Sequence, residues 1–217
     1  MRALRVPLED SRGLFLDQLH EFVSAAAGMD DLAALDPARC RGWSRLDVIV
    51  HVRLGVEEMA ATAAAYTDQT PDHDAASYWT SHPDDRDADP VAHILWLRRT
   101  ASAYSRPASA VHHLRLVADL ARRVLVGAPD RVVLFQGKAM TMGDFLATWV
   151  VELAVHQLDL GSGGTPVGAA LARRTLEAIA GADLPEQLSD ADAVLAGLGR
   201  IPWPPQTGSP GRFPVSL

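Results

Sequence analysis

The chain has 217 residues, of which 48% are apolar, so it can bury a sizeable core as one domain or one domain with a small appendage. Its net charge of -7 and its scattered lysine and arginine residues argue against a surface built for nucleic acid. No window reaches the roughly 20 uncharged apolar residues of a membrane span, and the single cysteine, Cys40, excludes an internal disulfide, so a reducing compartment, the cytoplasm, is expected.

The first predicted helix covers residues 8–27. Its apolar side chains recur at spacings close to three and four residues, and Gly28 follows as a helix stop. His20 lies within this helix and is predicted to be a surface or partly packed side chain, as histidine ordinarily is. The helix is amphipathic, which together with the apolar composition allows a homodimer.

A second helical segment lies within residues 35–66. Ser44 followed by Asp47 is a capping signal, in which side chains satisfy the free N–H groups of a helix start, and good helix formers then continue to Tyr66. His51 lies one turn after Asp47. Asp47 therefore either closes the cap, which its motif favours, or orients a ring N–H of His51, as carboxylates do for metal-bound histidines.

Residues 67–90 are rich in aspartate, proline and small polar residues, which predicts a long loop with at most one helical turn at residues 75–79. Loops of this length in compact domains are often lids or entrances, with disorder as the alternative. His73 and His82 lie among aspartates here and are predicted to be solvated.

Helical periodicity returns at residues 91–104 and 107–126, with a proline at the break between them. His113 borders the apolar stripe of the second of these helices, which makes it a rival to His51 as a buried ligand. His93, in the first, is assigned to the surface or its boundary.

Residues 131–142 alternate weakly around Gln136 and Gly137, which predicts two short strands and a tight turn. Thr141 is then the expected N-cap of a helix that begins at the next residue and ends in the glycine-rich run at residues 161–164.

That helix is apolar on almost every face, as buried helices are, yet it carries Glu152 and His156. Their i, i+4 spacing sets both side chains on one face, and Asp159 follows within a turn. A carboxylate among apolar side chains is costly to desolvate unless a cation or a set of donors meets it. The pair therefore either binds a metal ion, with a third ligand from elsewhere in the chain, or is a buried carboxylate and imidazole with ordinary partners.

Two further helices are predicted at residues 167–180 and 190–198, the second capped by Ser189, before a tail rich in proline and glycine that is expected to lie over the surface. We expect a mainly all-α fold, an up-and-down four-helix bundle with extra short helices and a small β-hairpin. The bundle takes residues 1–165, and residues 166–217 form a short C-terminal helical extension with an irregular tail.

Two stretches carry recognisable motifs: CRGWSRLDVIVHV at residues 40–52 and WVVELAVHQLDL at residues 149–160. They resemble the signatures C-x-G-W-[ST]-x-x-D-x-x-x-H and V-E-L-x-x-H-x-x-D-L of the mycothiol-dependent maleylpyruvate isomerase family, within the DinB-like metal-binding bundles. The resemblance, rather than the periodicity, puts His51 in place of His113 as the third ligand. Matched residue by residue, the family's metal ligands fall on His51, Glu152 and His156.

The resemblance implies a divalent ion and mycothiol as a thiol co-substrate. Two imidazoles and one carboxylate suit Zn2+ and leave a fourth position open, although nickel and iron accept such ligands too. In the family's chemistry the mycothiol sulfur takes that position as a thiolate. The thiolate either adds to the double bond of maleylpyruvate and leaves after rotation to give fumarylpyruvate, or stays attached to an electrophile, as in thiol-transferase relatives.

The C-terminal part departs from the family pattern. Isomerase-type members carry a separate C-terminal domain that helps to form the active site, whereas little chain follows His156 here, which argues against maleylpyruvate as the substrate. Arg200 or Arg212 in this part could hold an anionic group, although surface arginine is the ordinary case. Cys40 is expected to be a small apolar filler rather than a catalytic thiol, and Trp43 a packing anchor.

Two functions of different classes fit these patterns. The first is a metal-dependent enzyme that uses a low-molecular-weight thiol for isomerisation or S-transfer on a small electrophile. The alternative is a non-catalytic DinB-like metal-binding module with a structural or regulatory role. The first requires an exchangeable ligand position that faces a cleft, whereas the second has that position filled by protein.

Overall fold

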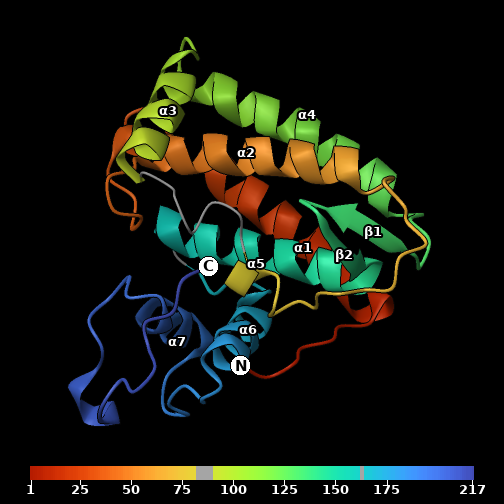
Figure 1. Ribbon diagram of the computed structural model, residues 1–217. Coiled ribbons are helices and arrows are strands. Elements are labelled where there is room, and N and C mark those ends of the chain that lie inside the picture. Colours follow the sequence, from red (N-terminus) through yellow and green to blue (C-terminus); the bar gives the residue numbers. More distant parts are fainter. Residues whose placement is uncertain (82–89, 162–163) are drawn as a thin grey trace.

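The structure is a computed structural model that describes residues 1–81, 90–161 and 164–217. Four long helices run alongside one another, with a hairpin at one end of the bundle and a short helix, α3, at the other (Figure 1). α1 packs against α5 and α4, and α2 packs against α4 and α5, so the four stand in the spatial order α1, α4, α2, α5. The predicted four-helix bundle is confirmed, with principal helices α1 (Leu8–Ala27), α2 (Arg45–Thr62), α4 (Pro107–Leu125) and α5 (Met142–Leu160).

Shorter elements surround this bundle. The last helices, α6 and α7, pack against each other, and α6 packs on α5, while α3 packs on α2. None of the helices in the described ranges combines the length and apolar character needed to cross a membrane. The shorter elements are η1 (Ala33–Leu35), η2 (Trp79–Ser81), α3 (Pro90–Ser102), β1 (Val132–Phe135), β2 (Lys138–Thr141), α6 (Ala169–Ala180), α7 (Asp190–Gly197) and η4 (Pro205–Thr207).

The helix ends follow the predicted caps. At the start of α2, the hydroxyl of Ser44 accepts from the backbone N–H of Asp47 at 3.1 Å, and the carboxylate of Asp47 accepts from the backbone N–H of Ser44 at 2.8 Å. Asp47 thus closes the cap, as its motif favours. Thr141 caps α5 in the same way through the N–H of Asp144, and Gly161 ends it with φ of 67°.

The predicted extension of α2 to Tyr66 is wrong, because the helix ends at Thr62. Backbone groups beyond that point pair with the hairpin instead. The N–H of Thr67 donates to the carbonyl of Val132 at 3.0 Å, and Tyr66 forms an antiparallel bridge with Val133. The edge of the hairpin therefore competes successfully with the helical propensity of this alanine-rich stretch.

The hairpin is confirmed. β1 and β2 pair antiparallel in a register that sets Phe135 opposite Lys138, so Gln136 and Gly137 form a two-residue turn. Both turn residues have positive φ, 49° and 76°, which is the backbone twist that a tight hairpin requires.

The loop predicted at residues 67–90 is described up to Ser81, and His82 lies outside the described residues. A turn before Trp79 leads into η2, close to the predicted helical turn. His73 is half-buried and pairs with Asp72 at an exposed position, 2.7 Å between Nδ1 and Oδ1, so it keeps some contact with solvent but is more enclosed than predicted. The described part of this loop is fixed because its backbone bonds to β2 and to the N-terminal residues.

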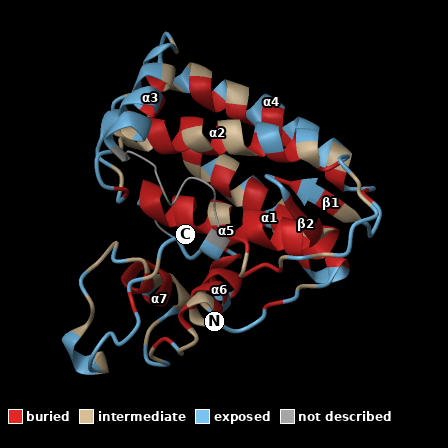
Figure 2. Ribbon diagram, viewed as in Figure 1, coloured by how far each residue is buried: buried red, intermediate tan, exposed pale blue. Residues whose placement is uncertain are grey.

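Helix α5 forms the centre of the molecule (Figure 2). Every residue of α5 is buried except Glu152, which is intermediate. A buried amide pair joins α5 to α1, with Gln18 Nε2 donating to Gln157 Oε1 at 2.6 Å, and Gln18 also accepts from the N–H of Gly168 before α6. The helix that carries two of the predicted ligands is thus fixed on all sides.

We expect Gly143→Ala to lower the free energy of unfolding by about 3 kcal/mol, because the added methyl overpacks a backbone crossing. A Cβ at Gly143 would lie 2.2 Å from the carbonyl oxygen of Val6. Gly13→Ala is the matched control: Gly13 lies within α1 with open space around it, so alanine should stabilise by about 0.5–1 kcal/mol. Denaturant unfolding measures both, and equal effects of the same sign would contradict the close crossing.

Candidate metal centre

The three predicted ligands meet where α2 packs against α5. Nε2 of His51 lies 2.9 Å from Oε1 of Glu152, and Nε2 of His156 lies 3.2 Å from the same oxygen. One ligand atom from each residue falls within 4.8 Å of the others. The structure therefore brings together residues about a hundred positions apart in the sequence, at a separation that one metal ion can span.

The close approach of the two helices depends on Gly55. It lies one turn after His51, and a Cβ at this position would be 2.9 Å from the ring of Trp149. Trp149 is itself three residues before Glu152 on α5. The glycine on one helix and the indole on the other thus set the distance across which the imidazole and the carboxylate face each other.

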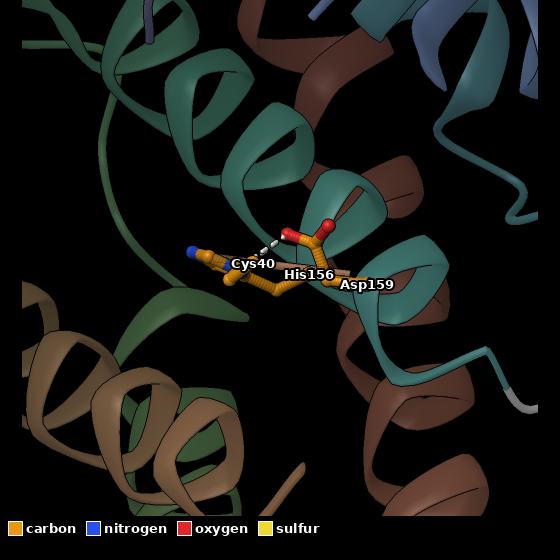
Figure 3. A group of neighbouring side chains, drawn as sticks. All are labelled: Cys40, His156 and Asp159. Carbon is orange, nitrogen blue, oxygen red and sulfur yellow. Dashed lines mark hydrogen bonds and ion pairs between the residues drawn. The ribbon is translucent and has the colours of Figure 1, made fainter. Parts of the chain in front are cut away.

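His156 uses both of its ring nitrogens. Its Nδ1 lies 3.2 Å from Oδ2 of Asp159, a carboxylate with a fully buried side chain (Figure 3). The same carboxylate accepts from the thiol of Cys40 at 2.8 Å and from Nε of Arg200 at 3.0 Å. A carboxylate on the far nitrogen is the usual partner of a metal-binding histidine, because it fixes the ring and leaves Nε2 as the ligand atom.

Cys40, His156 and Asp159 are a second group whose ligand atoms lie within 4.8 Å of one another. The guanidinium of Arg200 lies 3.0 Å from Asp159 and 3.8 Å from the sulfur of Cys40, so a further cation there would meet a positive charge. This group is therefore a hydrogen-bond network behind His156. Burial raises the pKa of the Cys40 thiol, which agrees with its predicted non-catalytic character.

The charges of the candidate ligands follow from their contacts. Burial raises the pKa of Glu152, but the charge of His156 and bonds from both imidazoles outweigh it, so this pKa falls well below its usual range. Burial lowers the pKa of His156, but the charge of Glu152 and the bonds to Asp159 and Cys40 raise it well above normal. Burial lowers the pKa of His51 more than Glu152 raises it. Without metal, an ionised Glu152 thus accepts from both imidazoles, and His156 is the imidazole that favours the protonated form.

A cavity of about 350 Å³ opens beside Glu152 and His156. The prediction that the tail merely lies over the surface is wrong, because the tail forms a wall of this cavity: Phe213 is buried, and the N–H of Val215 donates to the carbonyl of Gly197 at 2.9 Å. The remaining wall comes from α5 and the end of α7. The lining residues are Glu152, Val155, His156, Leu198, Arg200, Pro214, Val215, Ser216 and Leu217.

Other predicted candidates lie elsewhere. His113 on α4 bonds through Nδ1 to the hydroxyl of Tyr104 at 2.9 Å, and His20 is exposed on α1. Of the two arginines proposed for an anionic group, Arg200 lines the cavity, whereas Arg212 donates to the carbonyl of Ala180 at 3.0 Å.

Sequence reasoning missed the relation of Trp43 and His93 to the site. The ring of Trp43 lies 5.0 Å from that of His51 and is nearly parallel to that of His156 at 6.1 Å. The position of Trp43 just before a helix that carries His51 could have indicated this. His93 is exposed, as predicted, yet its ring lies 5.9 Å from that of Trp43, which no sequence pattern signals.

The family model described as the mycothiol maleylpyruvate isomerase N-terminal domain matches residues 15–161, a range that includes His51, Glu152 and His156. The chain belongs to this family. Its fold also matches a crystal structure of the mycothiol-dependent maleylpyruvate isomerase, with a TM-score of 0.65 and 18% identity over 95% of this chain and 96% of that one. A histidine-to-alanine mutant of the isomerase matches with a TM-score of 0.65 and 17% identity over 90% of both chains. Comparison with curated proteins gives no match.

The structural likeness corrects the expectation drawn from the short C-terminal part. Because 95% of this chain and 96% of the isomerase chain are covered, most of residues 166–217 must have a counterpart in that fold. The expected departure from the family pattern in the C-terminal part is therefore wrong, because the two folds match over nearly their whole lengths.

In metal-free protein, Glu152→Gln should lower the pKa of His156, because the substitution removes the negative charge that stabilises the protonated ring. The ring C–H signals of His156 in an NMR pH titration measure the change. Glu57→Gln, which alters an exposed carboxylate paired with Arg53 on α2, is the control and should leave the titration of His156 unmoved. An unchanged pKa in Glu152→Gln would contradict the contact between the two side chains.

Proposed function

We propose that His51, Glu152 and His156 bind one divalent ion, with Zn2+ the best-suited ion. Two imidazole nitrogens and a carboxylate oxygen are the donors of three-ligand zinc sites with an open fourth position. The side chains of His51, Glu152 and His156 retain 29%, 21% and 10% of their accessible surface, so a fourth ligand can reach the centre. The observation that supports this most directly is the convergence of the three ligand atoms beside a cavity.

The chain's own residues prepare this site. Asp159 accepts from Nδ1 of His156, so Nε2 is left as the ligand atom. Glu152 is ionised, and His51 favours the neutral form that ligation needs. A divalent ion held by His51, Glu152 and His156 would keep a coordinating thiol ionised at neutral pH.

We further propose that the protein is an enzyme that uses mycothiol as a nucleophile on a small electrophile, with cis–trans isomerisation of a maleylpyruvate-like substrate as the reaction. The thiolate forms an S–C bond at the double bond, and the electron pair moves onto the adjacent carbonyl as an enolate. Rotation follows about the carbon–carbon bond that was the double bond and is now single. The enolate then re-forms the double bond and expels the thiolate, so atoms and electrons balance without another reactant. In S-transfer, the same addition is followed by protonation of the enolate by water, so the sulfur stays attached to the electrophile.

The cavity beside the ligands supports this reaction. Arg200 places a positive charge on its wall, which favours an anionic electrophile such as a carboxylate. The tail residues Pro214 and Leu217 add apolar surface to the wall of the cavity. The free thiol of Cys40 fits a reducing, cytoplasmic setting, as does the use of a low-molecular-weight thiol. The homodimer that the composition allows stays a prediction.

We expect the purified protein to contain one zinc ion per chain and His51→Ala to weaken zinc binding by more than about a hundredfold, because one of three ligands is lost. Elemental analysis and competition with a chromophoric chelator measure this. His113→Ala, at the histidine that rivalled His51 in the sequence, is the matched control and should bind zinc normally. The zinc affinity of Asp159→Asn should lie between those of the two other variants, about tenfold below that of the wild type. Equal zinc affinity of His51→Ala and His113→Ala would contradict the assignment of His51 as a ligand.

The zinc-loaded protein should convert maleylpyruvate to fumarylpyruvate only when mycothiol is present, and His51→Ala should abolish the conversion while circular dichroism shows an intact fold. Absorbance and chromatography follow the products. Stoichiometric consumption of mycothiol with a stable conjugate would instead assign S-transfer. If the protein binds zinc tightly but transforms neither maleylpyruvate nor other electrophiles with mycothiol, the non-catalytic metal-binding module replaces the enzyme.

A further inference from the structure

A row of aromatic rings runs outward from the candidate metal centre. Trp43 contacts both imidazoles, with ring centroids 5.0 Å from His51 and 6.1 Å from His156. The next ring is His93, 5.9 Å from Trp43 and tilted by 31°, and the last is Trp96, 5.8 Å from His93 and tilted by 36°. The inner end of the row therefore touches the ligands, and each ring is only moderately turned from the one before it.

The outer end of the row is open to solvent. Trp96 retains 47% of its accessible surface, and His93 is exposed beside it on the same helix, α3. Exposed apolar side chains are common on this protein, but the ring of Trp96 also continues the row that leads to the candidate ligands. A ligand that covered the ring would remove apolar surface from water.

Helix α3 is fixed against the segment that carries Trp43. Nη2 of Arg98 donates to the carbonyl of Gly42 at 2.5 Å, and Gly42, with φ of 85°, leaves room for the side chain of Ile94. Helix α3 and the starting end of α2 lie at the same end of the bundle (Figure 1). The row is thus held in place by two elements rather than formed by one mobile side chain.

The row and the cavity are made of different residues, although both reach the ligand set. The cavity is bounded by Glu152, His156 and the positive charge of Arg200. The row begins at Trp43, which contacts His51 and His156, and continues through His93 to Trp96. A reaction between a thiol and an electrophile needs two reactants at one centre, so two approaches of different chemistry suit two different molecules.

We propose that Trp43, His93 and Trp96 form the subsite for the sugar and inositol rings of the thiol co-substrate. This rests on the proposed function, in which mycothiol is that thiol. Mycothiol joins its cysteine to two saturated six-membered rings, each with apolar C–H faces and hydroxyl edges. The C–H faces pack on the indole of Trp96, and the exposed nitrogen atoms of His93 offer hydrogen bonds to hydroxyl groups. The cavity on the Arg200 side is left for the electrophile.

The test compares two thiols on the zinc-loaded protein by calorimetry: mycothiol, and N-acetylcysteine, which has the thiol without the rings. Trp96→Ala should weaken mycothiol binding about fivefold, the size expected for loss of one aromatic contact, and leave N-acetylcysteine unchanged. Trp96→Phe, which keeps an aromatic face, should retain most of the affinity for mycothiol. Leu116→Ala, at an apolar residue of α4 that is somewhat more exposed than Trp96, is the matched control and should change the binding of neither thiol.

Equal weakening of both thiols by Trp96→Ala would overturn the subsite, because the ring would then merely support the centre. No change for either thiol would overturn it as well, while the proposed function stands as long as the wild-type protein binds mycothiol. Wild-type protein that binds zinc but neither thiol would remove the proposed function and, with it, the subsite. In steady-state assays, loss of the aromatic contact in Trp96→Ala should raise the KM for mycothiol and leave kcat unchanged.

Discussion

The contact between α2 and α5 is the constraint on which the candidate site depends. One of the three converging side chains comes from α2 and the other two come from α5, so the site exists only while these helices stay at their present separation. Gly55 permits that separation because it leaves the space that the indole of Trp149 fills. The bundle in turn keeps α5 fixed, since α1, α2 and α6 pack on it from different sides. The packing of α5 therefore determines both the stability of the fold and the geometry of the site.

Two imidazoles explain how a carboxylate can be accommodated in this buried helix. Glu152 is surrounded by apolar residues of α5, and its charge is met by two imidazoles rather than by lysine or arginine. Without an ion, one of those imidazoles must hold a proton to balance the charge, and His156 is the one whose surroundings favour it. A divalent ion would displace that proton. The arrangement thus resembles a metal site in its charge balance as well as in its donor types.

Much of the fold could be predicted from the sequence, because its signals are local. Caps such as Ser44 and Thr141, helix stops such as Gly161 and the Gln136-Gly137 turn act over a few residues, and the elements begin and end close to where they indicate. Two failures came from long-range pairing: Tyr66 bridges to β1 instead of extending α2, and the tail packs beside the ligands instead of over the surface. Local propensity carries no information about such partners.

The candidate site was likewise predictable from the sequence only where its signals are local. The i, i+4 pair on α5 could be read from its spacing, whereas periodicity alone left His51 and His113 as rivals, and a family resemblance was needed to choose between them. The roles of Cys40 and Arg200 around Asp159 could not be foreseen, because they depend on how the C-terminal part and the loop before α2 fold back onto the end of α5.

Arg200 has a consequence for how this chain can change during evolution. Arg200 forms an ion pair with Asp159, and Asp159 orients His156. A residue in the C-terminal extension is thus linked by direct contacts to the centre of the bundle. The C-terminal extension is therefore not an interchangeable appendage. A chimera that exchanged it between relatives would keep a well-oriented imidazole only if the arginine and the aspartate were inherited together, which makes positions 159 and 200 a pair expected to covary.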